Sequence, residues 1–156
     1  IDWPQAKAAV LDAYGEFSPL MADTARTFFD RNWIDAPVRP GKSPGAFSHP
    51  TVPSAHPFVL LNYQGRPRDV MTLAHELGHA ADLTYNDTSA RRQWKSARGI
   101  SSASPWWPAA GYPDFSTGSG DFAECFATWQ VGSSSRSNAG ACSNTDISLL
   151  VELLGG

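Results

Sequence analysis

Two histidines and a glutamate in the middle of the chain have the types and spacing of a metal-dependent hydrolytic centre. His75, Glu76 and His79 form the pattern H-E-x-x-H. Residues four apart on a helix share a face, so the two imidazoles can bind one metal ion. Glu76 lies about 100° around the helix from His75, where its carboxylate can reach a water on the metal. The pattern suits hydrolysis of a peptide bond, with one zinc ion per chain.

The short motif depends on a helical context, because two histidines on a helix can also be an ordinary surface pair. Residues 58–63 form an apolar run of strand length, followed by a turn. Asp69 is a suitable N-cap, and apolar residues recur at helical spacing from Val70 to Leu83. We therefore expect a helix over about 69–85 that carries both histidines and follows a strand.

A third metal ligand must come from elsewhere, because catalytic zinc usually has three protein ligands and an open position for water. Asp82 lies too close to His79 along the helix, so we expect it to support the site or face solvent. Glu124 is our choice, with Asp121 as the alternative ligand. These two residues can instead form a helix-capping box. The acidic residues after His79 are Asp82, Asp87, Asp114, Asp121, Glu124, Asp146 and Glu152.

Attack on a peptide carbonyl creates an oxyanion, which needs a hydrogen-bond donor besides the metal. Tyr112, in the loop before the helix of Glu124, is the leading candidate, and the family resemblances given below imply a donor in that loop. Packing against neighbouring aromatic rings is its alternative role. His56 is the second candidate, since it directly precedes the strand at 58–63, although it can equally be a surface histidine. Tyr112 and His56 are thus predicted to assist Glu76 in catalysis.

The composition indicates one folded domain with no electrostatic preference for nucleic acid. The 156 residues are 42% hydrophobic and 12% aromatic, and the formal net charge is −3. These values fit a single catalytic domain over 1–156, and near-neutral charge gives no case for nucleic acid. No segment approaches the roughly 20 apolar residues of a membrane span. Because the chain begins at Ile1, we expect a mature, trimmed or partial form.

The elements around the histidine helix are predicted to be mainly helical. Residues 1–32 have start signals for two helices, the first ended by Gly15 and the second starting at Ser18. Residues 33–57 are dense in Pro, Gly and Ser, which predicts irregular structure or short edge strands.

Two further helices are expected in the second half of the chain, over about 121–131 and 145–154. Thr145 or Asp146 would cap the last helix, and two terminal glycines would close it. The predicted fold class is therefore α+β. It is a mainly helical, zincin-like catalytic domain with a small sheet whose edge strand, at about 58–63, flanks the histidine helix.

Cys125 and Cys142 lack partners at the spacing of a zinc site. They form either one disulfide or two buried thiols. The chain after Leu83 is poor in Lys and rich in Ser, Gly and Trp, which is typical of exported proteins. We therefore expect a disulfide and a secreted protein, with a cytoplasmic location as the alternative.

Three separated motifs point to a known family. They are Trp33-Ile-Asp-Ala-Pro with Arg39-Pro-Gly-Lys-Ser-Pro-Gly-Ala-Phe-Ser, His56-Pro-Phe-Val-Leu-Leu-Asn-Tyr63, and Asp69-Val-Met-Thr-Leu-Ala-His-Glu-Leu-Gly-His-Ala80. Residues 1–83 thereby resemble oligoendopeptidase F of the thimet-oligopeptidase family of zinc metallopeptidases. The resemblance implies zinc ligands at His75 and His79 and a general base at Glu76. It also implies that residues 58–63 pair with the substrate backbone.

The second half departs from that family, which takes its third zinc ligand from a helix glutamate where this chain has Ser104. Residues 112–131 include Gly120-Asp-Phe-Ala-Glu-Cys-Phe-Ala-Thr-Trp129. This segment resembles the glutamate helix of the anthrax lethal factor and Pro-Pro endopeptidase group. That group has its ligand one helical turn before the glutamate of F-A-E, and this position is Gly120 here.

The predicted function is that of a zinc-dependent endopeptidase acting on peptides or unfolded proteins. Glu76 would take a proton from the attacking water and return it to the leaving amine. The alternative is a non-catalytic zinc-binding or protein-interaction domain that retains the metal helix. Glu76 argues against it, because a structural zinc site has no use for a base and favours four protein ligands.

Overall fold

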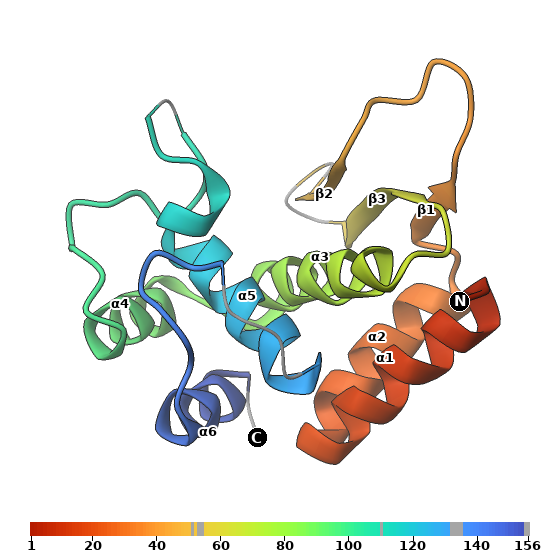
Figure 1. Cartoon of the computed structure of the whole chain (residues 1–156). Coiled ribbons are helices and arrows are strands. Elements are labelled where there is room, and N and C mark those ends of the chain that lie inside the picture. The colour runs from red at the N-terminus through yellow and green to blue at the C-terminus, as the bar shows by residue number, and fades with distance from the viewer. Residues whose placement is uncertain (51, 53–54, 110, 132–135, 155–156) are drawn as a thin grey trace.

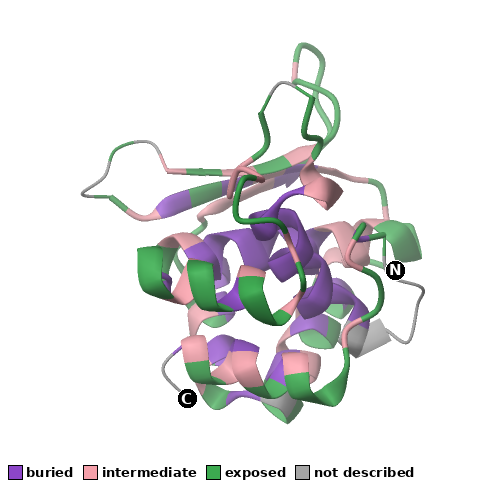
Figure 2. Ribbon diagram, turned by 90° about the vertical axis from the view of Figure 1, so that its left-hand side faces the viewer, coloured by how far each residue is buried: buried purple, intermediate pink, exposed green. Residues whose placement is uncertain are grey.

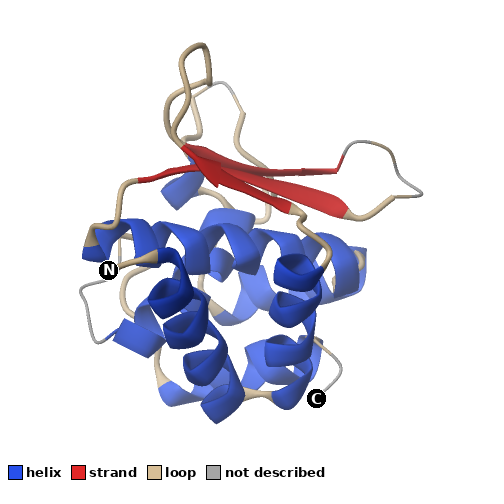
Figure 3. Ribbon diagram, turned by 90° about the vertical axis from the view of Figure 1, so that its right-hand side faces the viewer, coloured by secondary structure: helices blue, strands red, loops and turns tan. Residues whose placement is uncertain are grey.

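The fold is a small sheet lying over a layer of helices (Figures 1 and 3). This computed structural model describes residues 1–50, 52, 55–109, 111–131 and 136–154, so the two terminal glycines lie outside it. Its elements are α1 (Trp3–Phe17), α2 (Pro19–Asp30), β1 (Ile34–Pro37), β2 (Ala46–Pro50), β3 (Pro57–Tyr63), α3 (Pro67–Tyr85), α4 (Thr88–Ala97), the short 3-10 helix η1 (Asp114–Ser116), α5 (Gly118–Val131) and α6 (Asn144–Leu153). The architecture is mainly helical α+β, as the sequence predicts. No helix of the described part has both the length and the hydropathy to span a membrane.

The first helix continues past Gly15, where the sequence predicted its end. A glycine terminates a helix when it adopts the left-handed conformation, and Gly15 is not among the glycines with positive φ. Helix α1 ends at Phe17 because Ser18 is extended and Pro19 begins α2. The two helices therefore meet in a tight corner at Ser18.

The strand predicted at 58–63 is present as β3, but its predicted edge position is wrong. The strand order is β1-β3-β2, with β1 parallel and β2 antiparallel to β3. The short strands β1 and β2 end at Pro37 and Pro50 and lie in the Pro-rich segment for which the sequence predicted irregular structure or short edge strands. Ser48 of β2 donates its hydroxyl to the backbone carbonyl of Glu76 over 2.6 Å. This bond fixes edge strand β2 against α3.

Helix α3 lies between the sheet and the other helices, and its middle is buried. The helix begins at Pro67, so Asp69 lies in its first turn rather than at the N-cap. The Asp69 carboxylate accepts the backbone N–H groups of Gln64 and Arg66 over 2.8 and 3.0 Å. All residues from 73 to 82 are buried. The H-E-x-x-H motif is thus an interior feature, and Figure 2 shows the buried residues gathered where the sheet and the helices meet.

Two caps in the second half differ from the sequence expectations. Helix α5 begins at Gly118, three residues before the expected start at Asp121. The glycines at 118 and 120 lowered the helical signal of this turn. Helix α6 is capped by Ser143, whose hydroxyl accepts the N–H of Asp146. Asp146 completes the capping box from inside the helix rather than serving as the cap itself.

Helices α3 and α5 approach closely at Gly78. A Cβ atom at this position would lie 3.0 Å from the Cα atom of Ala123 and 3.2 Å from the Cβ atom of Phe126. Because the nearest atom belongs to the backbone, a side chain at 78 would push the two helices apart. Gly78 therefore sets the distance between the helix with the histidines and the helix with Glu124.

We expect Gly78→Ala to lower the free energy of unfolding by about 1–3 kcal/mol, through overpacking between α3 and α5. Gly15→Ala is the matched control, because it is helical with nothing within 4 Å of an added Cβ. The control should raise stability by about 0.5–1 kcal/mol through helix propensity. Urea denaturation measures both variants. A stabilised Gly78→Ala protein would contradict the close approach of the helices.

Candidate metal centre and active site

The two histidines of α3 converge on a carboxylate from η1. One ligand atom from each of His75, His79 and Asp114 lies within 4.8 Å of the others. One Asp114 oxygen is 2.8 Å from Nε2 of His75, and the other is 3.3 Å from Nε2 of His79. The sequence offered Asp114 only as one of several acidic residues. Its partners come from a different element, so their meeting depends on the course of the loop before η1.

The chemistry of this cluster fits a divalent metal ion. Two imidazole nitrogens and a carboxylate oxygen form a donor set that catalytic zinc uses. Within the described part of the chain, Oε2 of Glu76 is buried without a hydrogen-bond partner, and Oδ1 of Asp114 is buried with only its 3.3 Å ion-pair contact to Nε2 of His79. Buried polar atoms are normally paired, because leaving them unpaired is costly. A cation beside Asp114 and a water beside Glu76 would satisfy both oxygens.

Glu124 of α5 contacts the other ring nitrogen of His75. Its Oε2 atom is 3.1 Å from Nδ1 of His75, and its Oε1 atom accepts the backbone N–H of Arg136 over 2.8 Å. Glu124 is not part of the cluster formed by His75, His79 and Asp114. The sequence assigned it as the third ligand, and that assignment stays a prediction.

The carboxylates around His75 favour a positive charge at the centre. Burial lowers the pKa of His75, but hydrogen bonds with Asp114 and Glu124 raise it to about 9. Burial also raises the pKa of Asp114, yet its contacts with His75 and His79 hold it well below the usual range. The pKa of Glu76 is raised, mainly by burial. The space between the imidazoles and Asp114 therefore favours a cation.

Two cavities meet at this cluster, and both are lined by Ala46, Glu76 and Asp114. The larger measures about 640 Å³ and extends along α3 past His75. The smaller measures about 200 Å³ and lies between β2 and the segment that contains Trp107. Edge strand β2 thus lies beside both cavities, and a chain running through them would pass Glu76.

The two predicted oxyanion donors lie in different surroundings. Tyr112 is exposed, forms an isolated β-bridge with Ala109, and does not line either cavity beside Glu76. His56 stacks on Trp33 with ring centroids 3.3 Å apart and lines a separate cavity with residues of α2. The structure therefore does not bring these side chains together with Glu76, and their catalytic roles stay predictions.

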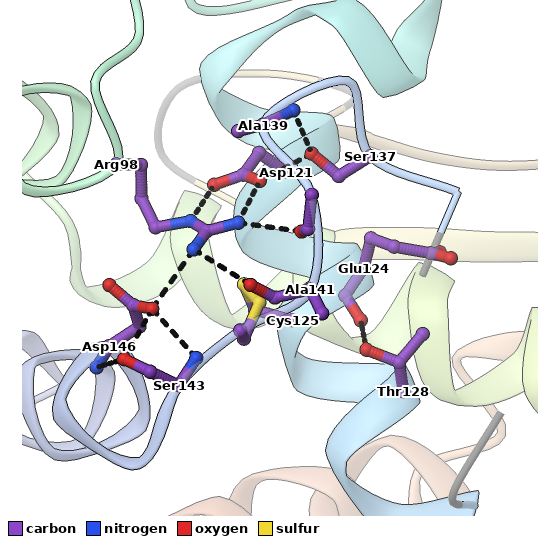
Figure 4. The surroundings of a disulfide bond; sticks show 12 residues. Arg98, Asp121, Glu124, Cys125, Thr128, Ser137, Ala139, Ala141, Ser143 and Asp146 are labelled. Carbon is purple, nitrogen blue, oxygen red and sulfur yellow. Dashed lines mark hydrogen bonds and ion pairs between the residues drawn. A yellow bond between two sulfur atoms is a disulfide. The ribbon is translucent and has the colours of Figure 1, made fainter. Parts of the chain in front are cut away.

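Asp121 is a buried partner of Arg98. It accepts hydrogen bonds from Nε of Arg98 over 3.0 Å and from the indole of Trp94 over 2.9 Å. Arg98 also contacts Asp146 of α6 over 2.9 Å, as Figure 4 shows. Asp121 lies outside the histidine cluster, and its predicted capping-box role is wrong because α5 begins at Gly118. Its place in the fold is to join α4, α5 and α6.

Asp82 is fully buried, and it accepts the indole N–H of Trp106 over 2.8 Å. It thereby supports the loop before η1, which agrees with a role beneath the site rather than on the metal. Cys125 of α5 and Cys142 are paired as a disulfide, beside Arg98 (Figure 4).

Asp121→Ala is expected to lower the free energy of unfolding by about 3–5 kcal/mol. The substitution removes the buried carboxylate that accepts hydrogen bonds from the guanidinium of Arg98 and the indole of Trp94. Zinc content at saturating zinc should be unchanged. Asp23→Ala is the control, since Asp23 forms only an exposed pair with Arg26 at 3.8 Å, and its effect should stay below about 1 kcal/mol. Loss of zinc with stability retained would instead identify Asp121 as a ligand.

Comparisons with known proteins match about half of the chain. Oligoendopeptidase F, chromosomal, of Lactococcus lactis subsp. cremoris is 37% identical over 76 residues, which is 49% of this chain and 12% of that protein. Group B oligopeptidase PepB of Streptococcus agalactiae is 34% identical over 76 residues, with the same coverage. Oligopeptidase PepF of Bacillus subtilis is 25% identical over 85 residues, 54% of this chain and 12% of that protein. No solved structure matches.

The pattern that defines Peptidase family M3 matches residues 11–94. The match includes β2, β3 and the whole of α3 with its H-E-x-x-H motif, but it ends before Asp114 and Glu124. The chain spans only a small part of the length of the curated relatives, which have 12% of their sequence aligned to it. Because the match extends over more than half of the 156 residues, and includes the element that carries the histidines, the chain belongs to Peptidase family M3.

Proposed function

We propose that the protein is a zinc-dependent endopeptidase that cleaves peptides or unfolded proteins. One observation carries the proposal: the Nε2 atoms of His75 and His79 converge on Asp114, beside a buried and unpaired oxygen of Glu76. Membership of Peptidase family M3 supports peptide-bond hydrolysis as the reaction. Only 12% of the length of these relatives aligns with this chain. The activity of the whole protein is therefore our inference.

His75, His79 and Glu76 would have different roles in the reaction. A bound zinc ion supplies positive charge that polarises a carbonyl and makes water more acidic. His75 and His79 would hold that ion through Nε2. Glu76 would accept a proton from the attacking water at Oε2 and return it to the leaving amine. Burial raises the pKa of Glu76, which makes its protonated form a less costly intermediate state.

The substrate backbone would lie along β2 rather than along β3. The sequence assigned this role to residues 58–63, but both sides of β3 are occupied by neighbouring strands. Strand β2 is at the edge, and an extended peptide can add to an exposed edge through backbone hydrogen bonds. Its residues Ala46 to Ser48 line the small cavity that also contains Glu76. Edge pairing at β2 would therefore bring a scissile bond past the proposed base.

We keep Tyr112 as the proposed oxyanion donor, because its loop directly precedes η1 and the Asp114 carboxylate. Its hydroxyl would have to turn toward the cavities when a substrate binds. His56 packs flat on Trp33, which supports a structural contribution more than a catalytic one.

Glu76→Gln should lower kcat/KM for cleavage of a mixed peptide library by about 10²–10⁴-fold, because the amide cannot accept the proton. Zinc content should stay near one ion per chain. Glu16→Gln, on an exposed position of α1, is the matched control and should keep full activity.

Substrates N-methylated next to the scissile bond should show a raised KM if they pair with β2, because the methyl group removes a backbone N–H donor.

Two results would contradict the proposed function or the proposed role of Glu76. Full zinc occupancy in the unaltered protein, with no cleavage of any peptide or denatured protein, would favour a non-catalytic zinc-binding domain. Equal activity of Glu76→Gln and the unaltered protein would remove Glu76 from the mechanism.

We also propose that the protein works outside the reducing cytoplasm. The pairing of Cys125 with Cys142 supports this proposal, because such bonds persist in oxidising compartments. Native protein isolated without reductant should contain no titratable thiol, since the chain has only these two cysteines. Two free thiols in that sample would favour the cytoplasmic alternative.

A further inference from the structure

Helix α5 has no side chain at the position one turn before Glu124. That position is Gly120, and Asp114 occupies the space beside it. A Cβ atom at Gly120 would lie 2.0 Å from the backbone oxygen of Asp114 and 2.8 Å from its carboxylate Oδ1. Any side chain at 120 would therefore displace Asp114. The absence of a side chain on the helix is what lets the η1 turn enter the site.

The Asp114 backbone is held firmly in this place. Its carbonyl accepts the N–H of Thr117 over 2.9 Å and the Thr117 hydroxyl over 2.8 Å. The same hydroxyl accepts the N–H of Gly120 over 3.1 Å. Thr117 thus ties the η1 turn to the first turn of α5. The carboxylate of Asp114 is presented from a fixed backbone, as a metal ligand needs to be.

The two nitrogens of His75 face two different carboxylates. Nε2 is 2.8 Å from Asp114, on the side shared with His79. Nδ1 is 3.1 Å from Glu124. The two ring nitrogens point away from each other, so a carboxylate bonded at Nδ1 lies on the side of the ring remote from the ion. A metal-binding imidazole usually donates its other N–H to a carboxylate in this manner.

We propose that Asp114 is the third metal ligand and that Glu124 is a positioning residue, which orients His75 through Nδ1. This inference rests on the proposed zinc-dependent function. It assigns the third ligand to the η1 turn instead of helix α5. The η1 turn lies in a segment that the family match does not reach. Gly120 is part of the site, because its missing side chain makes room for Asp114.

Zinc affinity, measured by competition with a chromogenic chelator, separates the two carboxylates. Asp114→Ala should weaken zinc binding by more than about 100-fold, since a ligand is lost. Glu124→Ala should weaken it by about 10–100-fold, as for other groups that orient a ligand. Glu124→Gln should restore most of that loss, because its amide oxygen still accepts the N–H of His75. Gly120→Ala should also weaken binding, whereas the control Gly15→Ala should not.

A cobalt spectrum tests the ligand assignment directly and does not depend on a loss of binding. Asp114→Cys and Glu124→Cys are each loaded with Co²⁺, which takes tetrahedral sites similar to those of zinc. A thiolate bound to Co²⁺ gives an intense charge-transfer absorption in the near ultraviolet. We expect this band from Asp114→Cys and not from Glu124→Cys.

The reverse pattern would overturn the inference. If Glu124→Gln loses zinc as severely as Glu124→Ala while Asp114→Ala binds normally, Glu124 is the ligand. The charge-transfer band in Glu124→Cys alone would lead to the same conclusion. Both results leave the endopeptidase proposal intact, because the unaltered protein would still bind zinc and cleave peptides. An unaltered protein that binds no zinc would overturn the function and the ligand assignment together.

Discussion

The burial of unlike charged groups in one small space is the constraint on which this structure depends. His75, His79 and Glu76 are buried, and the partly exposed Asp114 meets the two histidines from η1. Buried carboxylates and imidazoles are stable only when each is paired or bound to a cation. The helices, the edge strand and the η1 turn around the cluster hold these groups at ion-binding distances. The catalytic zinc site that we propose would use all four groups.

The packing of α3 explains how the cluster is assembled from distant parts of the chain. Gly78 lies within the H-E-x-x-H motif itself and permits the close approach of α5, which carries Glu124 to His75. On the other face of α3, Ser48 binds the carbonyl of Glu76 and places the sheet edge beside it. The motif therefore contains the proposed ligands, the proposed base and the glycine that sets the helix spacing in one short segment.

The sequence predicted those features that depend on local spacing. The histidine helix, the strand at 58–63 and the mainly helical class follow from periodicity, and the structure confirms them. For residues 33–57 the sequence predicted irregular structure or short edge strands, but not their bounds, because Pro37 and Pro50 obscure the pattern of two very short strands. Asp114 was not chosen because its position depends on Thr117 and on long-range contacts of a loop. Spacing along a chain carries no information about which of several acidic residues such a loop delivers.

The η1 turn and α3 are separate segments of the chain, and a shared ion would fasten them together. Binding to the folded form alone links folding to the free concentration of the ion, so affinity for metal becomes conformational stability. The arrangement of η1 over the histidines would then be most populated in zinc-replete surroundings. In zinc-poor surroundings the same turn would be freer to leave the histidines, and the protein would reach its hydrolytic form only where metal is available.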